Sequence, residues 1–174
     1  KGSRDPLGIQ PLWTRLGRYV VGNLTTVTNS VRDFTTLILG YYFAERLSDD
    51  LGPGSELAVF LKWEQLAAYA RFSVNGERGF RGVERVQKTV NDNSRVVISA
   101  DQAHQILSNQ KTYGLWGLYT MSARSSGLVE GVIPRLTPPT LEFVEKCYLP
   151  MFQDGAGKDG RRIPVEVRLK GYHS

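Results

Sequence analysis

The sequence predicts a mainly helical α+β protein, in which a helical N-terminal half packs on a winged-helix-like C-terminal half. Three observations support this fold class. Hydrophobic residues make up 41% of the 174 residues, which is enough for a packed core. Apolar residues recur at helical spacing between breakers in residues 28–72. Residues 99–149 have the order of a winged helix, with helical stretches, two short strands around a tight connection, and a capped helix.

The expected helices of the N-terminal half lie at residues 11–21, 28–47 and 56–72, after an extended lead-in. Apolar side chains cover much more than one stripe of the second helix, so it is predicted to be largely buried. A segment rich in glycine and proline, residues 48–54, ends it. Ser55 then begins the third helix, whose apolar pattern has one polar interruption, at Glu64.

Residues 73–98 are predicted to hold only short elements. Glycines among polar residues indicate a loop at residues 73–82. Residues 83–89 are expected to form a helical turn. Residues 95–98 are rich in β-branched side chains, which is typical of a short strand.

The C-terminal half is predicted to begin with helical stretches at residues 103–109 and 112–126. Two short strands and a further helix follow. Thr137 is a natural N-cap, and Pro138 suits the first helical position because no hydrogen bond is lost there. This Thr-Pro pair is the clearest helix-start signal in the chain and predicts where the last helix begins.

These elements divide the chain into three parts. Residues 1–98 form a helical subdomain with a basic loop, and residues 99–152 form a winged-helix-like subdomain. Residues 153–174 are expected to be a flexible loop with an edge strand, since Val165 and Val167 alternate with charged residues.

Composition limits the class of protein. No apolar run is long enough to cross a membrane, and no signal-peptide pattern is visible, so a cytoplasmic location is expected. The single cysteine, Cys147, excludes an internal disulfide and a zinc site with several cysteines. Its apolar helical surroundings predict a buried, inert thiol. The chain begins at Lys1 rather than methionine, which suggests that it is part of a longer protein.

No catalytic residue, metal site or cofactor is predicted. His104 and His173 are far apart and have no ligands at metal-site spacing. Acidic residues of the tail, such as Asp154 and Asp159, lie in a glycine-rich loop rather than on the rigid elements that a metal-dependent nuclease needs. Glycine and hydroxyl residues at 22–30 resemble a phosphate site at a helix N-terminus, but we interpret them as a capping segment.

The net charge of +5 suits a polyanionic partner, and its distribution indicates one region. Residues 71–100 hold six basic and three acidic residues, whereas residues 101–150 hold four of each. Arginines interleaved with glycines and aromatic residues can neutralise phosphates, although an ordinary solvated loop has the same composition. The expected nucleic-acid-binding side chains are Arg71, Arg78, Arg81, Arg85, Lys88, Lys111 and Arg124.

The apolar character of residues 112–126 does not fit a helix that reads bases. A recognition helix presents polar side chains to the major groove. The aromatic residues Tyr113, Trp116 and Tyr119 instead suit a protein–protein or oligomer interface, with the winged helix as scaffold. That interface is one alternative function. A second is a DNA-nicking enzyme whose active site lies outside this chain.

Four segments carry a resemblance to known proteins: residues 12–34, Gln110-Lys-Thr-Tyr-Gly-Leu-Trp-Gly-Leu-Tyr119, Ser126-Gly-Leu-Val129 and Arg135-Leu-Thr-Pro138. In this order, they resemble a loosely related set of poorly characterised bacterial proteins linked with phage-defence or DNA-modification gene clusters. The resemblance spans about residues 5–150, and its motifs are structural, so it implies no catalytic residue. It implies DNA-linked defence work. Together with the basic loop, it leads to our functional hypothesis, a duplex-DNA-binding module of a larger defence or DNA-modification protein.

Overall fold

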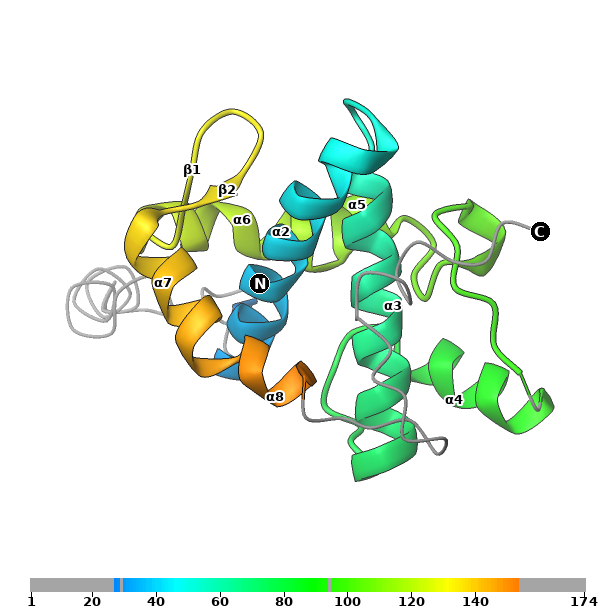
Figure 1. The fold of residues 1–174 in the computed structure, drawn as a ribbon. Helices are drawn as coiled ribbons and strands as arrows, with labels where there is room; N and C mark the ends of the chain where they lie inside the picture. The colour runs from blue at the N-terminus through cyan, green and yellow to red at the C-terminus, as the bar shows by residue number, and fades with distance from the viewer. Residues whose placement is uncertain (1–26, 29, 94, 154–174) are drawn as a thin grey trace, which may run out of the picture.

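The computed structural model of the protein describes residues 27, 28, 30–93 and 95–153. These residues are mainly helical, which confirms the predicted class. The helix expected at residues 11–21 and the edge strand expected near Val165 lie outside the described residues. The elements in Figure 1 are α2 (Val31–Leu51), α3 (Glu56–Asn75), α4 (Val83–Asp92), the 3-10 helix η1 (Gln102–His104), α5 (Gln110–Tyr113), α6 (Leu115–Ser125), β1 (Val129–Glu130), β2 (Arg135–Leu136), α7 (Pro138–Cys147) and α8 (Leu149–Gln153).

Helices α2 and α3 form the centre of the molecule (Figure 1). Ser30 caps α2 by accepting a hydrogen bond from the Asp33 N–H at 3.3 Å, within the predicted capping segment. The two helices approach closely at Gly40, where a Cβ atom would lie 2.7 Å from the Phe60 ring and 2.8 Å from the Trp63 ring. This approach buries most of α2, as its apolar sequence predicts.

Helix α6, the β1–β2 hairpin and α7 pack on one side of α2 (Figure 1). The two strands are antiparallel, with Val129 opposite Leu136. Both side chains enter the largest hydrophobic cluster together with Val144 of α7. The two predicted short strands and the helix after them are therefore confirmed. The assignment of this half to the winged-helix class stays a prediction.

Thr137 occupies the predicted N-cap position of α7, but its side chain has a different role. Its hydroxyl donates a hydrogen bond to the Gly127 carbonyl at 2.8 Å rather than accepting one from the first turn of α7. The Thr137 N–H donates to the Leu128 carbonyl at 3.1 Å. Thr137 therefore ties the start of α7 to the base of the hairpin.

Helix α4 packs against α3, away from the hairpin (Figure 1). Residues 83–89 were expected to form only a turn, but α4 is ten residues long. Its apolar side carries Val83, Val86 and Val90, and these pack in a second hydrophobic cluster with Phe80 and Ile106. Tertiary packing of these valines stabilises a helix that the sequence alone indicates only weakly.

The expectations for residues 95–109 are wrong. Residues 95–98 form no strand, and the helix expected at 103–109 is reduced to η1. The reason is that a side chain takes the place of a partner strand. The amide of Gln65 on α3 accepts from the Ser99 N–H at 3.1 Å and donates to the Ser99 carbonyl at 2.7 Å. A buried glutamine thus satisfies the backbone of a segment that has little regular structure of its own.

The single helix expected at residues 112–126 is divided at Gly114 into α5 and α6. A Cβ atom at Gly114 would lie 2.4 Å from the Gln110 carbonyl oxygen and 2.7 Å from both carboxylate oxygens of Glu64. The Leu115 N–H donates to Glu64 at 2.8 Å. A carboxylate from α3 therefore occupies the place where the helix would otherwise continue.

The largest hydrophobic cluster contains side chains from both expected subdomains, including Leu37 and Phe60 from one and Tyr119 and Val144 from the other. Cys147, in contrast, is exposed, so the prediction of a buried thiol is wrong. The buried side chains of α7 are Thr140 and Val144, and Cys147 has the same helical spacing but lies at the exposed end of the helix.

Candidate functional site

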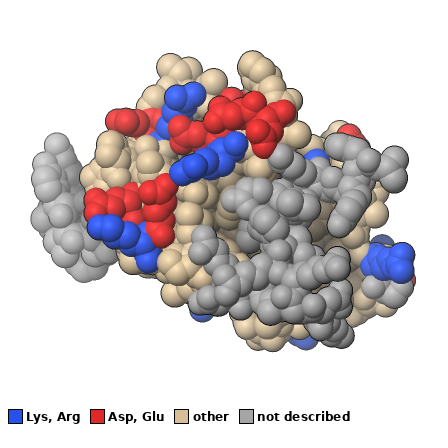
Figure 2. All heavy atoms as spheres, in the orientation of Figure 1, with Lys and Arg blue, Asp and Glu red and all other residues tan. Residues whose placement is uncertain are grey.

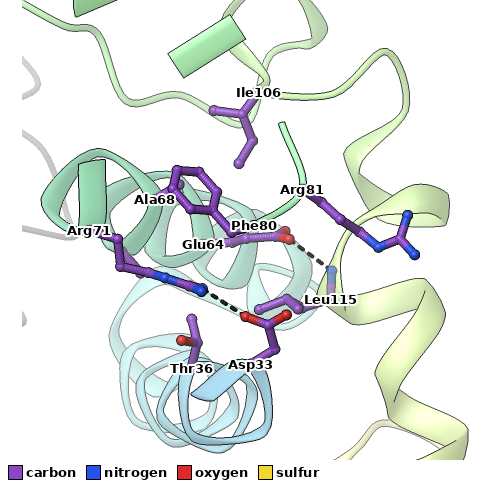
Figure 3. A pocket seen from close by; sticks show the side chains of 10 residues that line it. Asp33, Thr36, Glu64, Ala68, Arg71, Phe80, Arg81, Ile106 and Leu115 are labelled. Carbon is purple, nitrogen blue, oxygen red and sulfur yellow. Dashed lines mark hydrogen bonds and ion pairs between the residues drawn. The ribbon is translucent and has the colours of Figure 1, made fainter. Parts of the chain in front are cut away.

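Two buried carboxylates, Asp33 of α2 and Glu64 of α3, lie close to the centre of the molecule. Figure 3 shows them around a small cavity together with Arg71, Phe80 and Leu115. The cavity has a volume of about 20 Å³, which is room for about one water molecule. Buried charged groups need partners, and the partners of these two define what the cluster does.

Glu64 is 5% exposed, and both of its carboxylate oxygens accept hydrogen bonds from the protein. Oε1 accepts from the Leu115 N–H at 2.8 Å, and Oε2 accepts from the Gln110 amide at 2.8 Å. Burial is nevertheless the dominant influence, and it raises the pKa of Glu64 to about 7. The sequence signal for this residue was the single polar interruption in the apolar pattern of α3.

Asp33 is held by partners on two other helices. Arg71 Nη1 of α3 lies 2.7 Å from Asp33 Oδ1, and the Tyr119 hydroxyl of α6 donates to Asp33 Oδ2 at 3.0 Å. Desolvation, together with the neighbouring Asp33 carboxylate, raises the pKa of Tyr119 to about 12. Both oxygens of Asp33 are therefore engaged within the fold, and α2, α3 and α6 meet at this residue.

The other side of Arg71 pairs with Glu77, which follows the end of α3. Gly76 adopts φ 63° and reverses the chain, and the Glu77 N–H then donates to the Arg71 carbonyl at 3.1 Å. This turn returns the Glu77 carboxylate to within 2.6 Å of Arg71 Nη2. The hydrogen bond from Arg71 lowers the pKa of Glu77, and Arg32 adds a second ion pair at 2.6 Å.

The central cluster is an internal support rather than a reaction site. The oxygens of Asp33 and Glu64 are occupied by protein donors, and the cavity between them is too small for a substrate. What the cluster can do is fix the relative positions of α2, α3 and α6. Sequence reasoning missed this role because the partners are far apart in the chain.

Arg71 was expected on a phosphate-binding surface, and the geometry corrects this. Its side chain is 11% exposed, and its guanidinium bridges Asp33 and Glu77. It also lies over the Phe80 ring, with 5.0 Å between the guanidinium carbon and the ring centroid. Because the Arg71 side chain contacts Asp33, Glu77 and Phe80 inside the fold, we do not count it in the candidate interface.

Four of the expected basic residues are exposed on α4 or in the loop that precedes it: Arg78, Arg81, Arg85 and Lys88. We call them the basic strip. Arg81 extends past the central cavity with its guanidinium directed away from the two carboxylates (Figure 3). Arg85 Nη1 donates to the Gln105 carbonyl at 2.6 Å, which leaves its other N–H groups available. Among the described residues, none of the four has an ion-pair partner at salt-bridge distance.

The last two expected residues, Lys111 and Arg124, are on two other helices. Lys111 is exposed on α5. Arg124 of α6 donates through Nη2 to the carbonyls of Gly131 at 2.8 Å and Val132 at 3.0 Å, so it holds the hairpin loop. The hairpin and α4 lie at opposite ends of the molecule in Figure 1. Arg124 therefore has a structural role that its sequence position did not indicate.

The face seen in Figure 2 is not uniformly basic. Acidic and basic side chains lie next to one another over α2 and α7. Arg46 pairs with Glu145 at 2.9 Å, and Lys146 pairs with Glu142 at 2.5 Å. Paired charges of this kind leave little net potential for a polyanion, so the basic strip is the better candidate interface.

The described residues contain no candidate metal site. Within residues 27–153, apart from the undescribed positions 29 and 94, no group of three or more His, Cys, Asp or Glu side chains could hold a metal ion. In the same part of the chain, no helix has the length and apolar character needed to cross a membrane. Searches of protein-family models, curated proteins and solved structures find no match to this chain.

Proposed function

We propose that the chain is a nucleic-acid-binding module, with duplex DNA as its partner, that belongs to a larger bacterial defence or DNA-modification protein. The basic strip is the observation that supports DNA binding. Its cations are exposed and free of carboxylate partners among the described residues. Such side chains attract a phosphate backbone because each neutralised phosphate releases counterions. The link to defence rests on the sequence resemblance alone.

The spacing of the strip suits backbone contact. Arg85 and Lys88 are three residues apart on α4, so they lie on the same side of the helix. Arg78 and Arg81 precede α4 in the connecting loop. Two exposed acids of α4, Glu84 and Asp92, reduce the excess of positive charge. We therefore propose contacts to phosphates rather than to bases.

We further propose that α5, α6, the hairpin and α7 form a winged-helix-like scaffold that does not read bases. The order of the elements supports the scaffold. Helix α6 buries Leu115, Tyr119 and Ala123, and Arg124 is engaged by the hairpin loop. Few polar side chains are left on α6 to enter a groove.

The proposal is tested by DNA affinity as a function of salt. Fluorescence anisotropy with a short duplex should show affinity falling about a hundredfold between about 50 and 200 mM salt, since about four phosphates are neutralised. The double substitution Arg78→Ala and Lys88→Ala should reduce the salt slope by about two. The double substitution Arg46→Ala and Lys146→Ala removes the same charge from α2 and α7, outside the basic strip, and should leave the slope unchanged. Absence of binding at the lower salt concentration contradicts the proposal.

A second candidate, a homo-oligomer interface, is favoured by the tip of the hairpin. Val132 is 97% exposed and Ile133 is 50% exposed, on a loop that Arg124 holds in place. Of the three aromatic residues expected at an interface, Tyr119 is buried and Trp116 packs against the core, and only Tyr113, 55% exposed, is on the surface. An exposed pair of aliphatic side chains on a fixed loop suits contact with a second copy of the chain.

Light scattering at increasing protein concentration tests this second candidate. The wild-type protein is expected to form a dimer, and Val132→Ser is expected to shift it to a monomer. Met151→Ser removes another exposed apolar side chain, on α8, and serves as the matched control. A wild-type protein that stays monomeric at all concentrations excludes the hairpin interface.

A further inference from the structure

A groove of about 250 Å³ lies between α4 and the segment that follows it. Its polar lining comes from three parts of the chain: Arg85 and Thr89 on α4, Asn93 and Arg95 after it, and His104 of η1. No aspartate or glutamate lines the groove. A concave surface that gathers cations and hydrogen-bond donors without a carboxylate is suited to an anion.

The charged donors of the groove are largely unused, whereas the amides of two other lining residues, Asn93 and Gln105, donate to the Thr89 and Ala100 carbonyls. Among the described residues, Arg95 and His104 make no side-chain hydrogen bond or ion pair, and Arg85 uses only Nη1, toward the Gln105 carbonyl. The exposed acids Glu84 and Asp92 adjoin Arg85 and Asn93 in sequence but do not line the groove, and Asp101 accepts a hydrogen bond from the Ser99 hydroxyl at 2.9 Å. Two guanidinium groups therefore face the groove with free N–H groups, which match the geometry of phosphate oxygens.

We propose that this groove binds a phosphate monoester. A monoester offers three terminal oxygens and more negative charge than a backbone diester, which suits the two arginines, Arg85 and Arg95, of the groove lining. Tyr69 and Val97 add apolar wall beside these donors, which suits the nucleoside attached to the phosphate. Two sources share this chemistry, the 5′-phosphate at the end of a DNA strand and a free nucleotide. The first source rests on the proposed DNA binding, and the second does not.

The experiment compares two duplexes of one sequence, with a 5′-phosphate or a 5′-hydroxyl, by fluorescence anisotropy. The wild-type protein is expected to bind the phosphorylated duplex about tenfold more tightly, as one charge-assisted contact provides. Arg95→Ala should abolish that preference. Arg78→Ala, which removes an exposed arginine outside the groove lining, should weaken binding to both duplexes and keep the preference.

A second arm uses adenosine 5′-monophosphate in isothermal titration calorimetry. Binding that Arg95→Ala removes and Arg78→Ala leaves unchanged supports the groove, even where neither duplex binds and the proposed DNA function is lost. A preference for the phosphorylated duplex without nucleotide binding also supports the groove and assigns it to strand ends. Salt-dependent binding of both duplexes with equal affinity, and no nucleotide binding, overturns the groove while leaving the proposed DNA function in place.

Discussion

Replacing Arg71 with alanine is expected to lower the free energy of unfolding by about 3–5 kcal/mol, because the change leaves buried carboxylates without their cation. The side chains of Asp33 and Glu77 are only 8% and 20% exposed, so water replaces the guanidinium poorly. A loss of this size is a large fraction of the stability of a typical domain, which is about 5–15 kcal/mol. Urea denaturation followed by circular dichroism measures it.

Two other substitutions make the Arg71 experiment specific. Arg71→Lys keeps the charge but loses the planar guanidinium that reaches both carboxylates. Its free energy of unfolding is expected to lie between those of the wild type and Arg71→Ala. Arg78→Ala removes an exposed arginine and should change stability by less than about 0.5 kcal/mol. If Arg71→Ala is as stable as Arg78→Ala, the ion pairs at Arg71 do not support the fold.

The Glu64→Gln variant is expected to be less stable than the wild-type protein at acidic pH, and as stable or more stable at alkaline pH. Burial raises the pKa of Glu64 from 4.5 to about 7, so the folded state holds this proton more tightly than the unfolded state. The wild-type protein should therefore lose about 3 kcal/mol of stability relative to the variant between about pH 4.5 and pH 7. At lower pH both states of the wild type are protonated, and the penalty disappears.

The amide introduced by Glu64→Gln leaves one donor, the Leu115 N–H or the Gln110 amide, without its acceptor. The variant should consequently be less stable than the wild type near pH 5, by about 1–3 kcal/mol, and as stable or more stable near pH 8. Urea denaturation at both pH values measures the difference. Glu142→Gln changes an exposed carboxylate, and its stability relative to the wild type should not change sign between these two pH values. Parallel pH profiles for the wild type and Glu64→Gln would contradict a raised pKa.

The parts of the fold that sequence reasoning predicted correctly depend on local chemistry. Ser30 caps α2 and Pro138 begins α7, and the breaker predicted at residues 48–54 ends α2, although the helix continues to Leu51 before it reaches the glycine and proline residues. Each of these signals acts within a few residues of the element that it defines. The order of elements around the tight connection likewise placed the two short strands.

The errors arise where distant side chains decide the local structure. Residues 95–109 are shaped by Gln65, and the division between α5 and α6 is imposed by Glu64, more than 40 positions earlier. Arg71 was expected on the surface because it was grouped with the arginines of a glycine-containing basic loop, while its partner Asp33 lies 38 positions away. No periodicity within a short window indicates such pairings.

The hydrogen bonds of the Gln65 amide couple an irregular segment of the chain to the unfolding of the helical core. The amide joins the irregular segment at Ser99 to α3 and also donates to Gln110 at 3.2 Å, whose own amide reaches Glu64. A chain of side-chain amides thus runs from the central carboxylate to the backbone beside the groove. We expect this wall to share the stability of the helical core instead of opening as a separate loop. A ligand in the groove would then meet a preformed surface, and little conformational entropy would be lost when it binds.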